Sequence, residues 1–139
     1  MFLLDTHVWL WIVEGHSHRI GRRTVRLVEQ WAEHSALRIS PLSVFEVAQL
    51  YASGRLQLSR TLEQWTTSAL ETVGGRVLPL TVGAATDAGT MGLIAVPDPL
   101  DRLLVATARL SNATFVTADR RILDYAAKTA TLRVHDARR

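Results

Sequence analysis

The stretch FLLDTHVWLW, residues 2–11, decides the fold that we predict for this chain. Its first three residues, Phe2–Leu4, form a short apolar run that stops at Asp5, as expected for a buried strand followed by a turn. The residues after Asp5 continue as a helical stretch. A strand that leads directly into a helix is the repeating unit of a parallel sheet with helices on its faces.

The rest of the chain repeats this alternation of short β-like runs and longer helical stretches. We predict further strands at residues 37–40, 76–80, 114–117 and 132–134, with Pro79 limiting the second of these. We predict helices at residues 22–34, 44–56, 62–72, 82–89, 100–110 and 121–128. The pattern therefore indicates one α/β domain over residues 1–139, with a mostly parallel sheet of four to five strands and helices on both faces.

The helix at residues 44–56 carries a recognisable start signal. Ser43 stands where an N-cap is expected, and Glu46 follows three residues later, which is the spacing of a capping box. We therefore expect Glu46 to lie in or near the first turn of that helix.

Four acidic residues follow strands or open helices in this scheme: Asp5, Glu46, Asp101 and Asp119. In a sheet with right-handed crossovers, the carboxyl ends of parallel strands meet at one edge, where ligand sites form. We expect at least three of the four carboxylates to gather there. Clustered carboxylates repel one another, and a hard divalent cation relieves that cost. Such an ion can also activate water for phosphodiester hydrolysis.

A structural role is the alternative for each acid taken singly. Acidic side chains in the first turn of a helix commonly cap free N–H groups and interact with the positive end of the helix dipole. Spacing alone does not separate this role from metal binding.

Composition excludes several other classes of protein. No cysteine is present, which excludes disulfide frameworks and thiolate zinc sites and is compatible with a reducing cytoplasm. No apolar run is long enough to span a membrane, and the apolar start lacks the basic residues of a signal peptide. The formal net charge is +3, and 15 of the 16 basic residues are Arg. Arg suits a phosphate-bearing partner, although a GC-rich genome also favours Arg.

Four segments of the chain, in order and spacing, resemble the PIN-domain ribonucleases, and most closely the VapC toxins of bacterial toxin–antitoxin pairs. These segments are LLDTHVWLW (3–11), SPLSVFEVAQL (40–50), DPLDRLLVATA (98–108) and FVTADRRIL (115–123). The resemblance implies a PIN-like three-layer fold and an endoribonuclease that depends on Mg²⁺ or Mn²⁺. It also implies a small antitoxin partner, an RNA substrate and a homodimer.

The resemblance also assigns roles to individual residues. The family's four acids correspond to Asp5, Glu46, Asp101 and Asp119. Asp5, Asp101 and Asp119 would hold the metal ion, and Glu46 would orient water or support the ligands. Thr6 and Thr117 would order the carboxylates through hydrogen bonds.

Several neighbouring residues have open roles. Asp98 supports either the site or, as we expect, its own turn. His7 is a ligand or, as we expect, a hydrogen-bonding support. Arg102 faces a phosphate or pairs with Asp98. Arg22, Arg23 and Arg26 form a basic helical surface, for which a solvated face is the default, and Arg120 and Arg121 adjoin Asp119, where phosphate contacts are plausible.

The chain contains four tryptophans, which belong either to the core or to an interface with a partner: Trp9, Trp11, Trp31 and Trp65. Two rival functions come from other classes. One is a non-catalytic RNA-binding module, which gains nothing from clustered carboxylates. The other is a phosphatase-like domain with Asp5 as nucleophile, which usually needs a nearby lysine, and the only lysine is Lys128.

Overall fold

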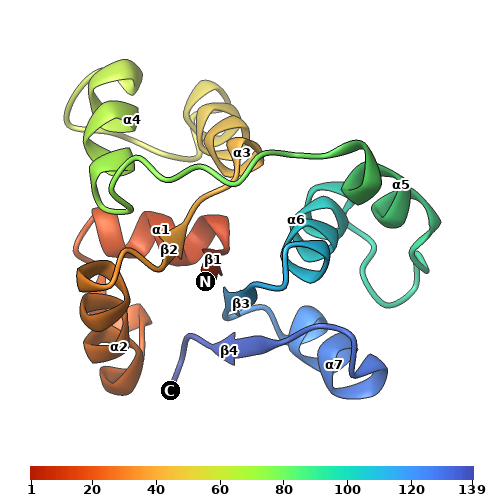
Figure 1. The fold of residues 1–139 in the computed structure, drawn as a ribbon. Helices are drawn as coiled ribbons and strands as arrows, with labels where there is room; N and C mark the ends of the chain where they lie inside the picture. Colours follow the sequence, from red (N-terminus) through yellow and green to blue (C-terminus); the bar gives the residue numbers. More distant parts are fainter.

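The computed structural model describes all 139 residues and contains one four-stranded, fully parallel sheet (Figure 1). The strands are β1 (Phe2–Leu4), β2 (Leu37–Arg38), β3 (Thr114–Thr117) and β4 (Val134–Asp136), in the order β2-β1-β3-β4. Both central strands, β1 and β3, have the bounds predicted from the sequence. The predicted α/β class with a parallel sheet is confirmed.

Seven α-helices and one short 3-10 helix connect or follow these strands. They are α1 (Thr6–Val13), η1 (Ser17–Arg19), α2 (Arg22–Glu33), α3 (Pro41–Ala52), α4 (Leu62–Glu71), α5 (Val82–Thr90), α6 (Pro99–Leu110) and α7 (Arg120–Thr129). Every predicted helix is present. None is long and apolar enough to cross a membrane.

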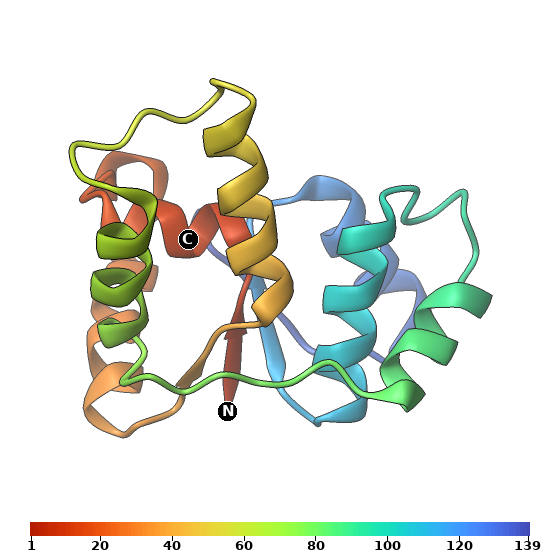
Figure 2. The ribbon, with the colours of Figure 1, turned by 90° about the horizontal axis from the view of Figure 1, so that it is seen from above.

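Alternate residues of the central strands are buried in two cores, one on each face of the sheet. Leu3 and its neighbour Phe115 belong to the core formed with α5, α6 and α7. Leu4 and its neighbour Val116 belong to the core formed with α1–α4. A strand covered on both faces needs apolar residues at consecutive positions, because successive side chains point in opposite directions. Figures 1 and 2 show α1–α4 on one side of the sheet and α5–α7 on the other.

The start of α3 differs from the prediction. Ser40, not Ser43, is the N-cap, and its side chain accepts a hydrogen bond from the backbone N–H of Leu42 at 3.1 Å. Pro41 occupies the first helical position, where its fixed φ and missing N–H are favourable. The helix therefore begins three residues earlier than predicted. A complete capping box occurs instead at Thr61 and Gln64, at the start of α4.

Two predicted strands also need correction. Residues 76–80 do not form a strand, because only Val77 makes a β-bridge, with Ile39, and Pro79 has no N–H to extend the pairing. The last strand is β4 at residues 134–136, not 132–134. Its pairing is set by β3, since Thr117 lies opposite Asp136.

Two of the four tryptophans are core residues. The indole rings of Trp9 and Trp65 meet edge to face at 5.3 Å between their centroids, and both side chains are fully buried. Trp11 and Trp31 are half-buried, and Trp31 stacks on Phe2. The core explanation therefore holds for the first pair, and the second pair remains partly accessible.

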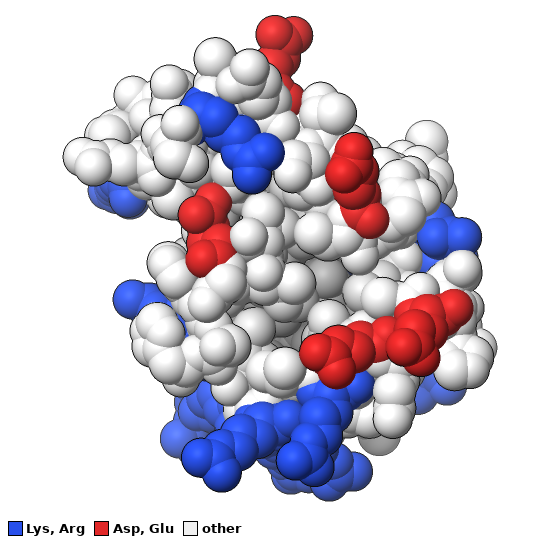
Figure 3. Space-filling model, turned by 90° about the vertical axis from the view of Figure 1, so that its left-hand side faces the viewer, with Lys and Arg blue, Asp and Glu red and all other residues white.

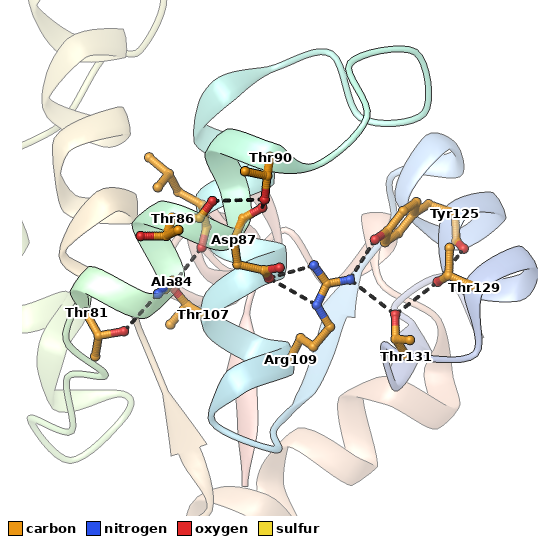
Figure 4. Close-up of polar contacts among 11 residues, drawn as sticks. Thr81, Ala84, Thr86, Asp87, Thr90, Thr107, Arg109, Tyr125, Thr129 and Thr131 are labelled. Carbon is orange, nitrogen blue, oxygen red and sulfur yellow. Dashed lines mark hydrogen bonds and ion pairs between the residues drawn. The ribbon is translucent and has the colours of Figure 1, made fainter.

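Arg109 of α6 joins three helices through one guanidinium group (Figure 4). It donates two hydrogen bonds to Asp87 Oδ2 of α5, at 2.6 and 3.1 Å. On its other side, it donates to the Tyr125 hydroxyl of α7 at 2.7 Å and to Thr131 Oγ1 at 3.2 Å. The Arg109 and Asp87 side chains are only 19% and 29% exposed, so solvent screens their ion pair only partly. This contact holds α5 and α7 against α6.

Replacing Arg109 by Met should lower the free energy of unfolding by about 1–3 kcal/mol, because it removes charge-assisted hydrogen bonds and leaves Asp87 unpaired. Lys128→Met is the matched control, since Lys128 is exposed and forms no ion pair. It should change stability by less than about 0.5 kcal/mol. Urea unfolding of both variants measures the difference, and equal effects would contradict the role given to Arg109.

Candidate active site

The carboxyl edge of the sheet brings together acidic residues from widely separated parts of the chain. Asp5 directly follows β1, and Asp119 follows β3 by two residues. Both are also helix N-caps, Asp5 for α1 and Asp119 for α7. In Figure 2, β1 and β3 run side by side, and α1 and α7 start at the same end of these strands. The edge predicted from the sequence is therefore the one on which these acids lie.

Asp5 is the most deeply buried of these acids, with 7% of its surface exposed. Its Oδ1 accepts a hydrogen bond from the Thr6 N–H at 2.8 Å, and its Oδ2 accepts one from the Thr117 hydroxyl at 2.6 Å. Burial raises the pKa of Asp5, and the hydrogen bond from Thr117 acts against that rise. The donors on both oxygens fix the orientation of the carboxylate. The predicted support of Asp5 by Thr6 and Thr117 is thus present, although through the backbone of Thr6.

The Thr6 hydroxyl connects Asp5's neighbourhood to α3. It lies 3.0 Å from Glu46 Oε1 and 2.9 Å from Ser43 Oγ. A threonine hydroxyl has one proton, so if it donates to Glu46, Ser43 must be the donor in the second contact. Because α3 starts at Pro41, Glu46 lies in the second turn and does not cap the helix. Sequence reasoning missed Ser43 as a site residue, although its spacing of three from Glu46 places both on one helix face.

Asp101 has the least satisfied carboxylate of the group. It is half-buried in the first turn of α6, and no hydrogen bond stabilises its ionised form. Burial and then the charges of Asp5, Asp98, Asp119 and Glu46 raise the pKa of Asp101 to about 7. All four carboxylates are therefore near enough to Asp101 to repel its charge. A helix-dipole role alone does not explain a carboxylate placed among four like charges.

The two remaining acids both cap helices through their side chains. Asp119 Oδ1 accepts from the N–H of Arg121 at 2.8 Å, and its own N–H donates to Thr117 Oγ1 at 3.0 Å. Thr117 thus links Asp119 to Asp5. Asp98 Oδ1 accepts from the N–H of Leu100 at 2.8 Å, so its expected role in supporting the turn is present. Asp119 therefore caps α7 and also lies at the acidic edge.

The carboxylates of this edge are chemically suited to a hard divalent cation, but they do not form a preassembled binding site. Carboxylate oxygens are the ligands that Mg²⁺ and Mn²⁺ favour, and the charge repulsion at Asp101 is the cost that a cation would relieve. No three Asp, Glu or His side chains, however, lie close enough together to hold an ion directly. Mg²⁺ commonly takes one or two carboxylates and keeps several waters. The assignment of Asp5, Asp101 and Asp119 as direct ligands stays a prediction.

Two neighbours of the acidic residues, Arg102 and His7, do not make the contacts considered from the sequence. Arg102 donates to the carbonyls of Val96 and Pro97, at 3.2 and 3.0 Å, and forms no ion pair with Asp98. Of the two roles left open for Arg102, the pairing with Asp98 is not present. His7 is exposed, and its ring lies 6.2 Å from that of Trp11. It makes no hydrogen bond, so the expected support role is not present either.

Comparison with known proteins identifies relatives of this chain. A family model for the PIN domain matches residues 2–128. Ribonuclease VapC22 of Mycobacterium tuberculosis is 32% identical over 120 residues, which cover 86% of this chain and 88% of that protein. The range matched by the family model includes all four predicted acids.

Solved structures confirm the fold. VapBC2 from Rickettsia felis, bound to a DNA fragment from its promoter, gives a TM-score of 0.66 at 16% identity, over 96% of each chain. FitAcB from Neisseria gonorrhoeae gives 0.64 at 23% identity, also over 96% of each chain. At these identities the likeness concerns the fold alone. From the family match and the relative at 32% identity, the chain belongs to the PIN-domain family, among its VapC-type members.

Proposed function

We propose that this protein is an endoribonuclease that depends on Mg²⁺ or Mn²⁺ and serves as the toxin of a type II toxin–antitoxin pair. The observation that carries the proposal is Asp101, a half-buried carboxylate without a hydrogen-bond donor and surrounded by four other acids. Family membership supplies the chemical context, since the curated relative is named a ribonuclease. Residues 1–139 would act as one nuclease domain.

Each acid has a role that follows from its surroundings. Asp5 is the best oriented, because hydrogen bonds hold both of its oxygens, and we assign it to the metal ion. Asp101 and Asp119 complete the proposed ligand set from the starts of α6 and α7. Glu46, held by the Thr6 hydroxyl, orients the attacking water. When bound, the divalent ion polarises a phosphoryl oxygen and lowers the pKa of water.

The rival phosphatase-like reading is less compatible with this geometry. A nucleophilic Asp5 would need a free oxygen, whereas the Thr6 N–H and the Thr117 hydroxyl engage both. It would also need a cationic partner, yet Lys128 lies in the last turn of α7 and is exposed. A role for Asp5 as a fixed ligand accords better with these contacts.

The proposed partner is a small antitoxin, and the proposed assembly is a homodimer. One structural neighbour is a toxin–antitoxin complex from Klebsiella pneumoniae, and another is a member of the VapBC family of toxin–antitoxin systems, which supports the first part. An antitoxin that covers the acidic edge would keep RNA away from it.

Loss of a ligand carboxylate should abolish cleavage of single-stranded RNA. Asp5→Asn and Asp119→Asn should each lower kcat/KM by more than about 100-fold, because even the supporting partners of metal ligands contribute about 10–100-fold. Glu71→Gln, an exposed amide substitution on α4, is the control and should retain activity. Cleavage is measured with Mn²⁺ and with chelator, and circular dichroism checks folding. A folded Asp5→Asn protein that cleaves at the wild-type rate would falsify the site assignment.

Expression of this chain alone in a bacterium should slow growth, because uncontrolled RNA cleavage stops protein synthesis. Co-expression of the adjacent small open reading frame should restore growth, and Asp5→Asn should remove the toxicity. Growth curves and RNA integrity provide the measurement. Normal growth in cells that contain soluble wild-type protein would count against the toxin role and leave the nuclease chemistry to the cleavage assay.

Without metal, Asp101→Asn should stabilise the protein at pH 8. The folded-state pKa of Asp101, about 7, lies above the ordinary value of 3.8, so the folded protein binds this proton more tightly than the unfolded chain. Ionised Asp101 therefore destabilises the fold above about pH 7, and the effect fades as the pH falls toward 4. Thermal melts in chelator should show a higher Tm for the variant at pH 8 and similar values near pH 4.

Metal should act in the opposite direction and favour the wild type. Mn²⁺ at about 100 times its dissociation constant should stabilise the wild type by roughly 2.7 kcal/mol, and Asp101→Asn by much less. Glu71→Gln should follow the wild type under every condition. If Asp101→Asn is less stable than wild type in chelator at pH 8 and gains equally from Mn²⁺, then Asp101 is only a first-turn helix charge.

A further inference from the structure

A basic cavity lies beside the acidic edge, and the proposed metal site does not use it. It has a volume of about 310 Å³ and is formed by the start of α7, strand β4 and the last residues of the chain. Its charged lining consists of three arginines, Arg120, Arg138 and Arg139, and two aspartates, Asp124 and Asp136, together with His135. Lined by only two hydrophobic residues, Leu123 and Val134, it suits a polar ligand.

Two residues of the cavity lining are neighbours of the proposed catalytic site, one in the sequence and one across the sheet. Arg120, in its lining, directly follows Asp119. Asp136, also in its lining, lies opposite Thr117 in the β3–β4 register, and Thr117 donates to Asp5. Neighbouring strands are about 4.8 Å apart, so the cavity begins one strand away from the Asp5–Thr117 pair. The cavity and the proposed catalytic acids thus lie on adjacent strands of the sheet.

Two of the three arginines are free to bind a ligand. Arg138 forms a two-point ion pair with Asp136, at 2.9 and 2.8 Å. Arg120 and Arg139 form no ion pair. Burial and then the charge of Arg23 on α2 lower the pKa of His135. Arg139 also lowers this pKa, whereas Asp136 raises it. The lowered pKa favours the neutral form of His135. The three arginines of the lining outnumber its two aspartates.

The backbone that carries Arg138 and Arg139 is anchored on α2. The Gly21 N–H donates to the Ala137 carbonyl at 2.9 Å, and the N–H and hydroxyl of Thr24 both donate to the Arg139 backbone oxygen at 2.9 Å. A Cβ at position 21 would lie 1.9 Å from that oxygen, so only glycine permits this contact. His135 Nε2 lies 2.7 Å from Thr24 Oγ1, which adds a further polar link to α2. The arginines thus extend from a fixed segment.

Basic side chains from α2 continue this surface. Figure 3 shows Lys and Arg side chains gathered at the lower edge of the face on which α2 lies, with acidic side chains above them. Arg22 and Arg23 in the first turn of α2 are exposed. The charge of Arg23 acts on His135, which lines the cavity, so basic side chains of α2 lie near it.

We propose that this cavity binds the phosphate next to the one that is cleaved, in a single strand of RNA, through Arg120 and Arg139. The inference rests on the proposed ribonuclease function and assigns to it a substrate-positioning subsite. A guanidinium group offers a planar pair of donors that matches two phosphate oxygens. A phosphate held here places the adjacent phosphodiester over the acidic edge. Arg120 and Arg139 are positioning residues, because they contact the substrate away from the reacting bond.

Binding of a labelled single-stranded RNA decamer, measured by fluorescence anisotropy in chelator, tests the subsite without cleavage. The Arg120→Gln/Arg139→Gln double variant should raise Kd about 10-fold at constant salt. The dependence of log K on log salt should become shallower by about 0.7, the value for one phosphate of a single strand. Arg60→Gln, an exposed arginine before α4 and away from this cavity, is the control and should change neither quantity. Both variants remove surface charge only, and thermal melts verify their folding.

Cleavage of the same RNA with Mn²⁺ supplies the second readout. The double variant should raise KM about 10-fold and change kcat by less than about 2-fold. An active wild type whose double variant keeps the KM, Kd and salt slope of Arg60→Gln overturns the subsite and leaves the nuclease intact. A wild type that never cleaves RNA, but whose binding weakens as expected in the double variant, overturns the nuclease and keeps the phosphate site.

Discussion

The parallel pairing of β1 with β3 is the constraint on which both the cores and the acidic edge depend. In this register Leu4 lies opposite Val116, and the next residue, Asp5, donates its N–H to the Val116 carbonyl at 2.9 Å. That contact brings the Asp5 carboxylate to the Thr117 hydroxyl. A shift by one residue would exchange the two faces of the strand and would also separate Asp5 from Thr117. Packing and polar geometry thus depend on the same register.

The acidic edge combines stabilising and destabilising features. Asp5, Asp98 and Asp119 each accept backbone N–H groups at a helix start, and these hydrogen bonds stabilise the helix ends. Asp101 has no such donor and is exposed to the repulsion of its neighbours. A fold optimised only for stability would not keep an unsatisfied carboxylate in this place. One destabilising carboxylate among aspartates that form capping hydrogen bonds is the pattern expected where function and stability conflict.

Sequence reasoning succeeded where local pattern and burial agree. The bounds of β1 and β3 were predictable because each is an apolar run that stops near an acidic residue. The acids on the edge followed from the rule for parallel sheets. The start of α3 was missed because Ser40 and Ser43 are both good caps and Pro41 decides between them. The shift of β4 and the basic cavity were not predictable, since they arise from pairing with β3 and from anchoring on α2, 115 residues away.

The separation of β1 and β3 along the chain also constrains how the molecule is made. Asp5 and Thr117, which share a hydrogen bond, are 112 residues apart. Strand pairings over such distances form late, because the entropy lost on closing a long loop is offset only once the strands are in contact. During synthesis, β1 and β2 are available early, but the centre of the sheet stays open until β3 leaves the ribosome. A nascent chain therefore carries Asp5 and Glu46 before Asp101 and Asp119 are made, so the complete acidic edge exists only after synthesis has passed Asp119.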